Sequence, residues 1–431
     1  MLFEGMVTTE RTPGTAGAHA GASATRGPAG APDAAVPAVL ATPAPTPLLP
    51  PHEDAELSTG LYPVTYVGEF EAAGEWPFPQ DRARVVLGGS QIRDDSPSPD
   101  ISIPGRGLSG THCLLERRAN SIRIYDQGST NGTYVGNTKI ATSWDVRIGD
   151  KFSPRPLTLF LMDSAMHTHR GLLTEILGTG FRPSPDMLLT EVVRQACHVI
   201  ITGEDGCGRE RLAKAIHDMS PRRAHAMLTG ADIPEDRAAQ SAFVRQASKP
   251  RTTVVLEVGP KRDHRPLDPT FISSLYSPSY GVRVIVLAAT EEDAEHALPK
   301  QQFRQSYHVS LRPLAYRSGE IDQLLDRMFA ARGAPHLRTA DLHVENQQAL
   351  RAHSWPKNLA QLHTAADAIV AHEAHGGLRA AGRVLGLAPA TIHGHLNRVG
   401  LKARKVGGSK RMSLFQSEGP GAGRADSRPD P

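Results

Sequence analysis

The stretch that decides the fold is Val199-Ile-Ile-Thr-Gly-Glu-Asp-Gly-Cys-Gly-Arg-Glu-Arg-Leu-Ala-Lys-Ala-Ile-His217. Its apolar start has the length of a buried strand. Gly203, Gly206 and Gly208 follow, and glycine turns tightly because it carries no Cβ. A helical pattern begins at Arg209. A strand, a glycine loop and a helix together form a phosphate cradle, where free backbone N–H groups and a helix start meet an anion.

The loop keeps the glycine spacing of the P-loop pattern GxxxxGK[ST], but its cation is altered. Arg209 stands at the lysine position and Glu210 at the Ser/Thr position. Arginine keeps the positive charge, yet its planar fork does not place a compact ammonium between two phosphates. The sequence therefore predicts the architecture of a nucleotide site with changed chemistry.

Composition limits the class of protein. The chain has 431 residues, 39% of them hydrophobic, and a formal net charge of +3, which is typical of several globular domains without a general affinity for nucleic acid. Its three cysteines form no CxxC pair, which fits a reducing cytoplasm and argues against structural zinc. We find neither an apolar run of about 18 residues nor a signal peptide. We expect a cytoplasmic protein with no metal site and no membrane partner.

The first half of the chain divides into a low-complexity segment and a β-rich region. Residues 1–58 are rich in Ala, Gly, Pro and Thr and are expected to be a disordered leader. Between 60 and 165, short alternating apolar runs are separated by turn clusters, which predicts an all-β sandwich. Two patches within it, at 107–112 and 126–135, concentrate hydroxyl, amide and glycine residues.

The order of these patches resembles the forkhead-associated (FHA) domain, a family that binds phosphothreonine peptides. Ser109 and His112 match its SxxH motif, and the Ser-Thr-Asn-Gly-Thr run at 129–133 matches its second block. The resemblance implies that Ser109 and Thr130 hydrogen-bond the phosphate, that Asn131 holds the peptide backbone, and that His112 braces the site.

Two arginines of that family are missing. Gly89 and Gly110 occupy their positions, although a phosphate usually relies on such charge-assisted contacts. Arg93 and Arg106 are the candidates to replace them from nearby loops. Two interpretations stay open at this point: a phosphothreonine-binding domain, and a protein-interaction module that ignores phosphate.

The second half alternates strands and helices. Residues 166–185 contain prolines and glycines and are expected to be a linker. Apolar, β-branched runs at 253–256 and 282–290 predict buried parallel strands. We therefore expect a three-layer α/β domain over 186–335, with the glycine loop at the strand ends, and a helical lid over 336–374.

This half resembles the AAA+ module of bacterial sigma-54-dependent activators, from about 170 to 372. That family usually reads GESGTGKE where this chain reads GEDGCGRE, so Glu210 follows the family pattern. Further matches are Ala288-Ala-Thr290, Phe303-Arg304, Arg317–Asp322 and Trp355–Leu359. The nucleotide-binding residues that the resemblance implies are Gly203, Glu204, Gly206, Gly208, Arg209, Glu210 and Glu257.

Departures from that family predict a loss of ATP hydrolysis. Glu257-Val258 replaces the Asp-Glu pair of the Walker B strand, and Val258 cannot orient or deprotonate a water. Ala360 replaces a sensor arginine, His308 lies near the place of a trans-acting arginine, and the GAFTGA loop that grips sigma-54 is missing. We expect a scaffold without catalytic residues that requires no cofactor, binds ATP and magnesium weakly at most, and does not act on sigma-54.

The stretch Leu378–Leu401 predicts two helices, broken at Gly386, with Pro389 in the first turn of the second. It resembles the Fis-type helix-turn-helix of the same activators, over 375–405. The positions that the resemblance turns toward DNA are Ala390, Thr391, His393, Gly394, His395 and Arg398, and the basic run that follows adds Lys402 and Arg404. Residues 406–431 are expected to be a disordered tail.

Together these resemblances imply a multidomain transcriptional regulator: an all-β FHA sandwich, an α/β AAA+ domain with a helical lid, and an all-α helix-turn-helix. Its expected partners are a phosphothreonine-containing protein and DNA with two-fold-related half-sites, bound by a homodimer or higher oligomer. Two alternatives stay open, an active ATP-dependent sigma-54 activator and a phospho-dependent adaptor that does not bind DNA. The histidines His363, His372 and His375 lack a metal spacing and are interpreted as solvated helix faces.

Overall fold

The computed structural model describes residues 65–416, with gaps at 73, 80, 91–97, 105–106, 119–120, 180–181, 194–196, 230–233, 235, 249–251, 260–267, 376 and 406–411. The expected leader at 1–58 and the tail from 417 onward lie outside the described residues. So do Arg93 and Arg106, the two candidate phosphate-binding arginines. No helix of the described part is both long and apolar enough to span a membrane.

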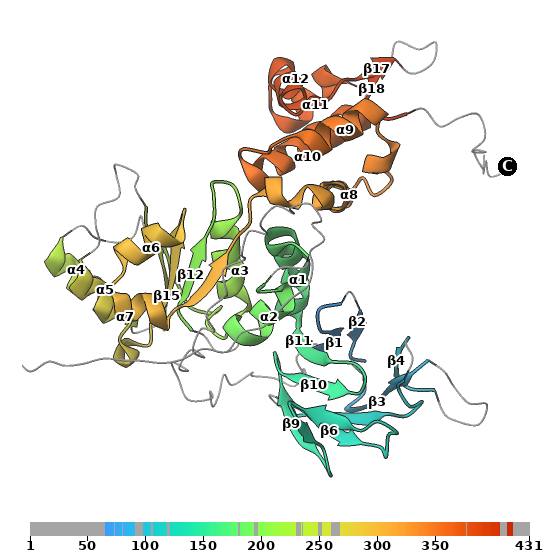
Figure 1. The fold of residues 1–431 in the computed structure, drawn as a ribbon, viewed down its shortest axis with the longest axis vertical. Helices are drawn as coiled ribbons and strands as arrows, with labels where there is room; N and C mark the ends of the chain where they lie inside the picture. The colour runs from blue at the N-terminus through green and yellow to red at the C-terminus, as the bar shows by residue number, and fades with distance from the viewer. Residues whose placement is uncertain are drawn as a thin grey trace, which may run out of the picture. The chain divides into compact units, whose positions relative to one another are not determined.

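The β-rich region forms two packed sheets, as its alternating runs predict (Figure 1). One sheet has the order β2(Glu75–Pro77), β1(Thr65–Glu69), β11(Leu159–Asp163), β10(Lys151–Pro154), β7(Thr133–Val135), β8(Thr138–Lys139). The other has the order β4(Ile101–Ile103), β3(Arg84–Gly89), β5(Cys113–Arg117), β6(Ser121–Asp126), β9(Trp144–Arg147). Leu115 lies opposite Ile124 in the β5–β6 pair, and both are fully buried. Alternate residues of each strand therefore fill one core between the sheets.

The expected linker at 166–185 is largely helical instead. Helix α1 spans Ser164–Leu177 and follows directly from β11, and the carboxylate of Asp163 accepts a 2.8 Å hydrogen bond from the Met166 N–H at its start. The prolines of this segment, Pro183 and Pro185, come only after α1 has ended, so they do not interrupt it. A short helix α2(Pro185–Met187) continues into π-type helical turns at Leu188–Val193.

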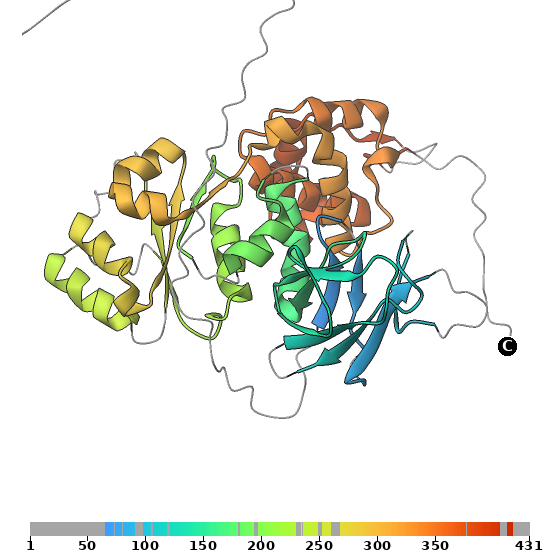
Figure 2. The ribbon, with the colours of Figure 1, turned by 60° about the horizontal axis from the view of Figure 1, so that its bottom comes forward.

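The α/β domain is a parallel five-stranded sheet in the order β13(Met227–Leu228), β14(Thr253–Glu257), β15(Arg283–Ala288), β12(Val199–Thr202), β16(Tyr307–Ser310). Successive residues of β12 pack into different cores: Val199 and Ile201 into one hydrophobic cluster, Ile200 into another. Helix α3(Arg209–Met219) covers the first face; α4(Arg237–Ser248), α5(Pro269–Leu275) and α6(Glu291–Ala297) cover the second, next to α7(Lys300–Gln305) (Figures 1 and 2). The predicted three-layer arrangement is confirmed.

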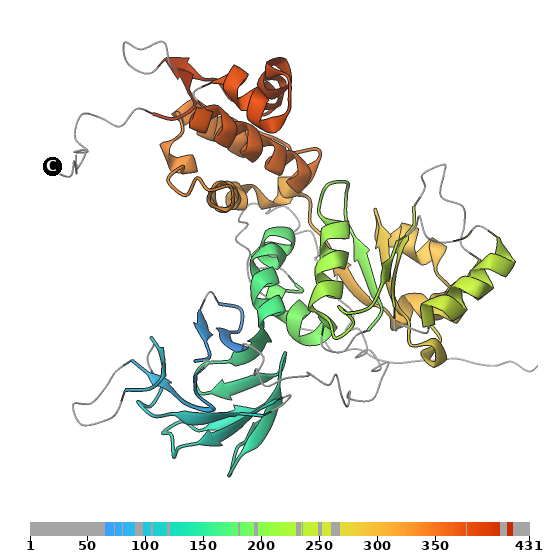
Figure 3. The same ribbon diagram turned by 180° about the vertical axis from the view of Figure 1, so that it is seen from behind.

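The helical lid and the end of the chain share one core. Its helices are α8(Ile321–Ala331), α9(Val344–Ala352), α10(Asn358–His375), α11(Leu378–Leu385) and α12(Pro389–Arg398), the last two packing beside α10 (Figure 3). Gly386 ends α11 and Pro389 opens α12, as expected. Ile392 and Leu396 of α12 belong to the same buried cluster as Leu362 of the lid. The helix pair is thus built onto the lid and is not a separately tethered module.

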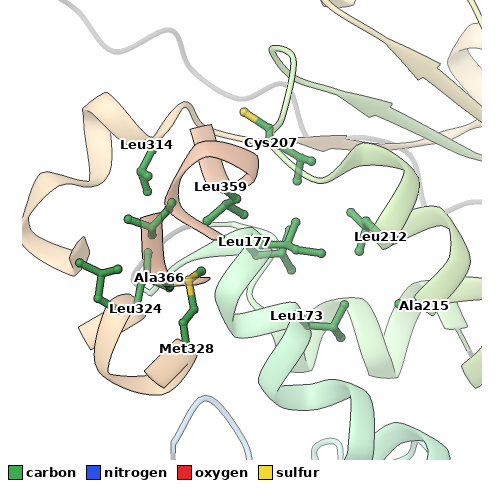
Figure 4. Packing of buried hydrophobic residues seen from close by; sticks show 14 of the residues in the cluster. Leu173, Leu177, Cys207, Leu212, Ala215, Leu314, Leu324, Met328, Leu359 and Ala366 are labelled. Atoms are coloured by element: carbon green, nitrogen blue, oxygen red, sulfur yellow. The ribbon is translucent and has the colours of Figure 1, made fainter. Parts of the chain in front are cut away.

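Helix α1 contributes to this core as well. Figure 4 shows Leu177 among side chains of the glycine loop and the lid, with Leu173 toward α3, where Leu212 and Ala215 lie. All of these side chains are buried. Helix α1, which precedes the α/β domain in the chain, therefore packs against both the glycine loop and the lid.

The expectation of a disordered tail over 406–431 is wrong for residues 412–416. The strand β18(Met412–Ser413) pairs with β17(Arg404–Lys405), and Leu414 and Phe415 are buried. The His343 N–H donates to the Leu414 carbonyl at 3.1 Å, which ties this segment to the start of α9. The apolar run is too short for a composition argument to detect among its Gly, Ser and Lys neighbours.

Candidate functional site

Two loops at one end of the sandwich bring the expected Ser109, Thr130 and Asn131 together. The Ser109 Oγ accepts a 3.2 Å hydrogen bond from the Thr130 N–H and lies 3.5 Å from the Thr130 Oγ1. The Asn131 side-chain amide donates to the Gly107 carbonyl at 2.9 Å. The hydroxyl pair and the amide therefore form a continuous polar edge across the two loops.

His112 braces these loops from below. Its Nδ1 accepts a 3.3 Å hydrogen bond from the Ser109 N–H, and its Nε2 lies 3.4 Å from the Gly132 carbonyl. Burial lowers the pKa of His112, although Gly132 and Asp126 act in the opposite direction. The ring is fully buried, so it supports the loops and does not reach the surface.

Asp126 organises the second loop, a role that our reading of the sequence did not assign. Its Oδ1 accepts hydrogen bonds from the hydroxyls of Ser129 at 2.6 Å and Thr133 at 2.8 Å. Burial alone raises the pKa of Asp126, but these hydrogen bonds bring it below its ordinary value. The sequence feature that could have predicted this role is the position of Ser129 and Thr133 three and seven residues after Asp126.

The two glycines at the end of β3 leave no room for an arginine. The Gly89 N–H donates to the Ser109 carbonyl at 3.0 Å. A Cβ on Gly88 would lie 1.8 Å from the Gly110 carbonyl oxygen, and one on Gly89 would lie 2.9 Å from that of Leu108. Close backbone packing replaces the side chain that the FHA resemblance implies here.

The glycine loop is closed by its own arginine. The Arg209 guanidinium donates to the carbonyls of Gly203 and Ala288, the latter at 3.0 Å, and lies 3.3 Å from an Asp205 carboxylate oxygen. Gly206 has φ +77°, and a Cβ there would lie 2.1 Å from the Lys357 carbonyl oxygen, so only glycine fits. The predicted Glu204, Gly208 and Glu210 lie in this loop or in the first turn of α3.

The lid is hydrogen-bonded directly to the loop. The Asn358 side-chain amide donates to the Asp205 carbonyl at 3.0 Å, while its Oδ1 accepts from the Leu314 N–H at 2.7 Å. The Ala360 N–H donates to the Gly206 carbonyl at 3.2 Å. Asn358 belongs to the Trp355–Leu359 motif, but the motif did not predict that its side chain binds the glycine loop.

Glu257 and Val258 separate at the end of β14. Glu257 is half-buried at the end of the strand, whereas Val258 is buried in the apolar cluster on the α5 face. The Val258 N–H donates to the Leu287 carbonyl at 2.8 Å. Elsewhere, Arg304 is exposed on α7, and His308 lies 3.3 Å from Glu291.

The residues expected to face DNA have two kinds of environment. Ala390, Thr391, His393 and Arg398 are exposed on α12, whereas Gly394 and His395 are half-buried. Burial, followed by the charge of Arg398, lowers the pKa of His395, so this ring adds no positive charge at neutral pH.

The basic segment after α12 is folded against α9. Lys402 exchanges two backbone hydrogen bonds with the Asn346 side chain, and Arg404 forms a 2.6 Å ion pair with Glu345. Lys402 is therefore held against α9 by its backbone, and Arg404 by its side chain. Residues 406–411 of that run lie outside the described part.

The interpretation of three solvated histidines is wrong for two of them. His372 is buried and lies 2.9 Å from a carboxylate oxygen of Glu373. The half-buried His363 lies 2.8 Å from Glu175 of α1. His375 is exposed. Among the residues described, no group of three His, Cys, Asp or Glu side chains is placed to hold a metal ion.

Comparisons with known proteins agree with this arrangement of domains. An FHA domain model matches residues 86–153, and a Sigma-54 interaction domain model matches residues 186–246. The C4-dicarboxylate transport transcriptional regulatory protein DctD of Pseudomonas aeruginosa is 26% identical over 203 residues, covering 39% of this chain and 44% of that protein. The DNA-binding transcriptional regulator NtrC of Klebsiella pneumoniae is 28% identical over 214 residues, covering 41% and 44%.

Among solved structures, NtrX from Brucella abortus in complex with ATP covers 55% of this chain and 68% of its own, with 18% identity and a TM-score of 0.33. The chain spans less than half the length of the curated relatives it matches. It therefore joins an FHA domain to a Sigma-54 interaction domain and is related to the sigma-54-dependent transcriptional regulators.

Proposed function

We propose that this protein is a transcriptional regulator that binds a phosphothreonine-containing protein with its FHA domain and DNA with α11 and α12. In this proposal the Sigma-54 interaction domain is a scaffold that does not hydrolyse ATP. The observation that carries the proposed loss of hydrolysis is the position of the Arg209 guanidinium. It donates hydrogen bonds to the carbonyls of Gly203 and Ala288, at the ends of two strands beside the glycine loop.

The geometry of the loop argues against a catalytic magnesium–nucleotide site. Arg209 uses its donors on protein oxygens, and the lid holds the Asp205 and Gly206 carbonyls. Val258 offers no oxygen to a water or a metal and is buried among apolar side chains. The donor set therefore does not fit the group that the family binds, and we assign no reaction step to it.

The FHA site supports recognition of a phosphorylated partner. Ser109 and Thr130 present two hydroxyls and a backbone edge to one side, and Asn131 lies next to them on a braced loop. We expect Ser109→Ala and Asn131→Ala to weaken binding to phosphothreonine peptides about tenfold, since each removes one hydrogen bond to an ionised ligand. Ser102→Ala, an exposed serine on β4, is the matched control. Equal binding of phosphorylated and plain peptides would contradict this assignment.

DNA binding rests on α12 and on the relationship to DNA-binding regulators. Thr391, His393 and Arg398 are exposed polar residues of α12, and a symmetric pair of such helices would match two-fold-related half-sites. A gel-shift titration with a mixed-sequence duplex tests this. Retardation at low salt should fall steeply as salt rises, and Arg398→Ala should weaken it. No retardation at low salt would favour the adaptor that does not bind DNA.

A further inference from the structure

Two cations lie beside the Asn131 end of the FHA site. Lys139 pairs with Tyr134 across the β7–β8 hairpin, and its Nζ lies 3.2 Å from the point where a Cβ on Gly132 would be. The Arg155 guanidinium lies 4.0 Å above the Tyr134 ring. The backbone N–H of Arg155 donates to the Gly132 carbonyl at 3.2 Å. The Lys139 ammonium therefore lies beside Gly132 and the Arg155 guanidinium lies over Tyr134, so both cations are close to the loop that carries Asn131.

The turn that carries Arg155 also contacts the residue that anchors Asn131. A Cβ on Gly107 would lie 2.8 Å from the Pro156 ring and 3.9 Å from the Asn131 amide nitrogen. The Gly107 carbonyl is the acceptor of that amide. Pro156, the residue after Arg155, and the Asn131 amide therefore both lie beside Gly107.

These cations are available to a ligand. Lys139 and Arg155 are both exposed, and within the part of the chain that the structure covers neither forms an ion pair with a carboxylate. Other exposed cations of the same sandwich do: Arg84 and Arg118 both pair with Glu116. Among the described residues, Gly88 and Gly89 contribute backbone alone to the other side of the site. Positive charge therefore lies at the Asn131 side of the hydroxyl pair.

We propose that Lys139 and Arg155 form a basic rim that binds acidic side chains flanking the phosphothreonine, so that the partner of this FHA domain is an acidic phosphopeptide. The proposal rests on the proposed phosphothreonine site and adds a sequence preference to it. In this arrangement Asn131 holds the peptide backbone next to the basic rim. Carboxylates of the peptide residues that flank the phosphothreonine then reach the Lys139 ammonium and the Arg155 guanidinium. Arginine and lysine both suit such contacts, with the guanidinium able to grip a carboxylate in two places.

The test measures calorimetric binding of the full chain to synthetic peptides. One peptide carries phosphothreonine between alanines, a second carries phosphothreonine between glutamates, and a third is the unphosphorylated glutamate peptide. We expect the phosphorylated glutamate peptide to bind about fivefold tighter than the alanine peptide, the size expected for two solvent-exposed ion pairs. The double variant Lys139→Gln/Arg155→Gln should lose this preference while binding the phosphorylated alanine peptide as before.

A control separates the rim from general charge. Lys151 is a cation of the same sandwich whose amine lies 4.0 Å above the Phe70 ring and 3.9 Å from Glu191, so Lys151→Gln should keep the preference. A preference that survives in the double variant, or that Lys151→Gln removes equally, would overturn the rim while leaving the phosphothreonine site intact. If neither phosphorylated peptide binds better than the plain one, the proposed site itself fails, and the rim with it.

Discussion

His112 shows how one buried side chain can hold two ligand loops. It accepts a hydrogen bond from the Ser109 N–H and faces the Gly132 carbonyl, so one ring bridges the segments that carry the hydroxyl pair. Because burial lowers its pKa, the neutral ring belongs to the folded state and the protonated ring does not.

We predict that His112→Ala destabilises the sandwich by roughly 1–3 kcal/mol, since it leaves the part-buried Ser109 N–H and the buried Gly132 carbonyl without their partner. The contribution of the native ring is fully present above its unfolded pKa of 6.5 and falls as the pH drops toward the lower folded value. Thermal unfolding of both proteins between neutral and mildly acidic pH measures this. An unchanged difference across that range would contradict a neutral His112.

At the scale of elements, the end of the chain fastens α11 and α12 to the lid. Glu373 of α10 accepts hydrogen bonds from the Ser413 hydroxyl and the Leu414 N–H, both at 2.8 Å. Burial raises the pKa of Glu373, but hydrogen bonds from His372, Leu414 and Ser413 bring it below its usual value. Residues 412–416, which we call the clasp, therefore hold the end of the chain against α10 and limit the movement of α12 against the lid.

We expect Glu373→Ala to release residues 412–416 and to expose the Leu414 amide to solvent, with a loss of roughly 1–3 kcal/mol in its opening free energy. In the native chain the clasp holds above pH 4.5, the ordinary value for this carboxyl, and weakens as pH falls through the depressed folded pKa. Hydrogen exchange at Leu414 reports both effects. Glu345→Ala, which removes an exposed partner of Arg404, is the control and should leave Leu414 protected.

These elements also show what the sequence could and could not predict. The apolar run at Val199–Ile201 and the helix that begins at Arg209 were predicted correctly, because an uninterrupted apolar run or helical spacing reports burial locally. The segment at 412–416 is too short for such a pattern, and its burial depends on α9 and α10, which are distant in sequence. Likewise, Ser109 and Asn131 were predicted from motifs, whereas the positions of Lys139 and Arg155 depend on how two hairpins pack.

At the scale of the whole molecule, one buried arginine connects the sandwich to the helices that precede the α/β domain. Arg170 of α1 grips both carboxylate oxygens of Asp186, at 2.8 and 2.7 Å, and donates to the Glu69 carbonyl at 2.8 Å. It also reaches the Glu75 carboxylate at 2.8 Å. The turn between β1 and β2 is thus bonded to α1 and α2 through a single guanidinium.

We predict that Arg170→Ala lowers stability by about 3–5 kcal/mol, because it leaves the buried Asp186 carboxylate without its countercharge. The double variant Arg170→Met/Asp186→Leu should cost less than the sum of the single variants, since the two groups share one interaction. Chemical unfolding followed by circular dichroism measures both. Lys214→Ala removes an exposed pair with Asp218 and should change stability by less than about 1 kcal/mol. Additive costs for Arg170 and Asp186 would contradict their coupling.

We propose that the Sigma-54 interaction domain does not turn over ATP. The most direct measurement is phosphate release from magnesium–ATP by the full chain, compared with its Arg209→Lys and Arg209→Ala variants. We predict no release above background in any of the three, because restoring the lysine leaves Val258 and Ala360 in place. Clear hydrolysis by the native chain that Arg209→Ala abolishes would contradict the claim and make the glycine loop a working catalytic site.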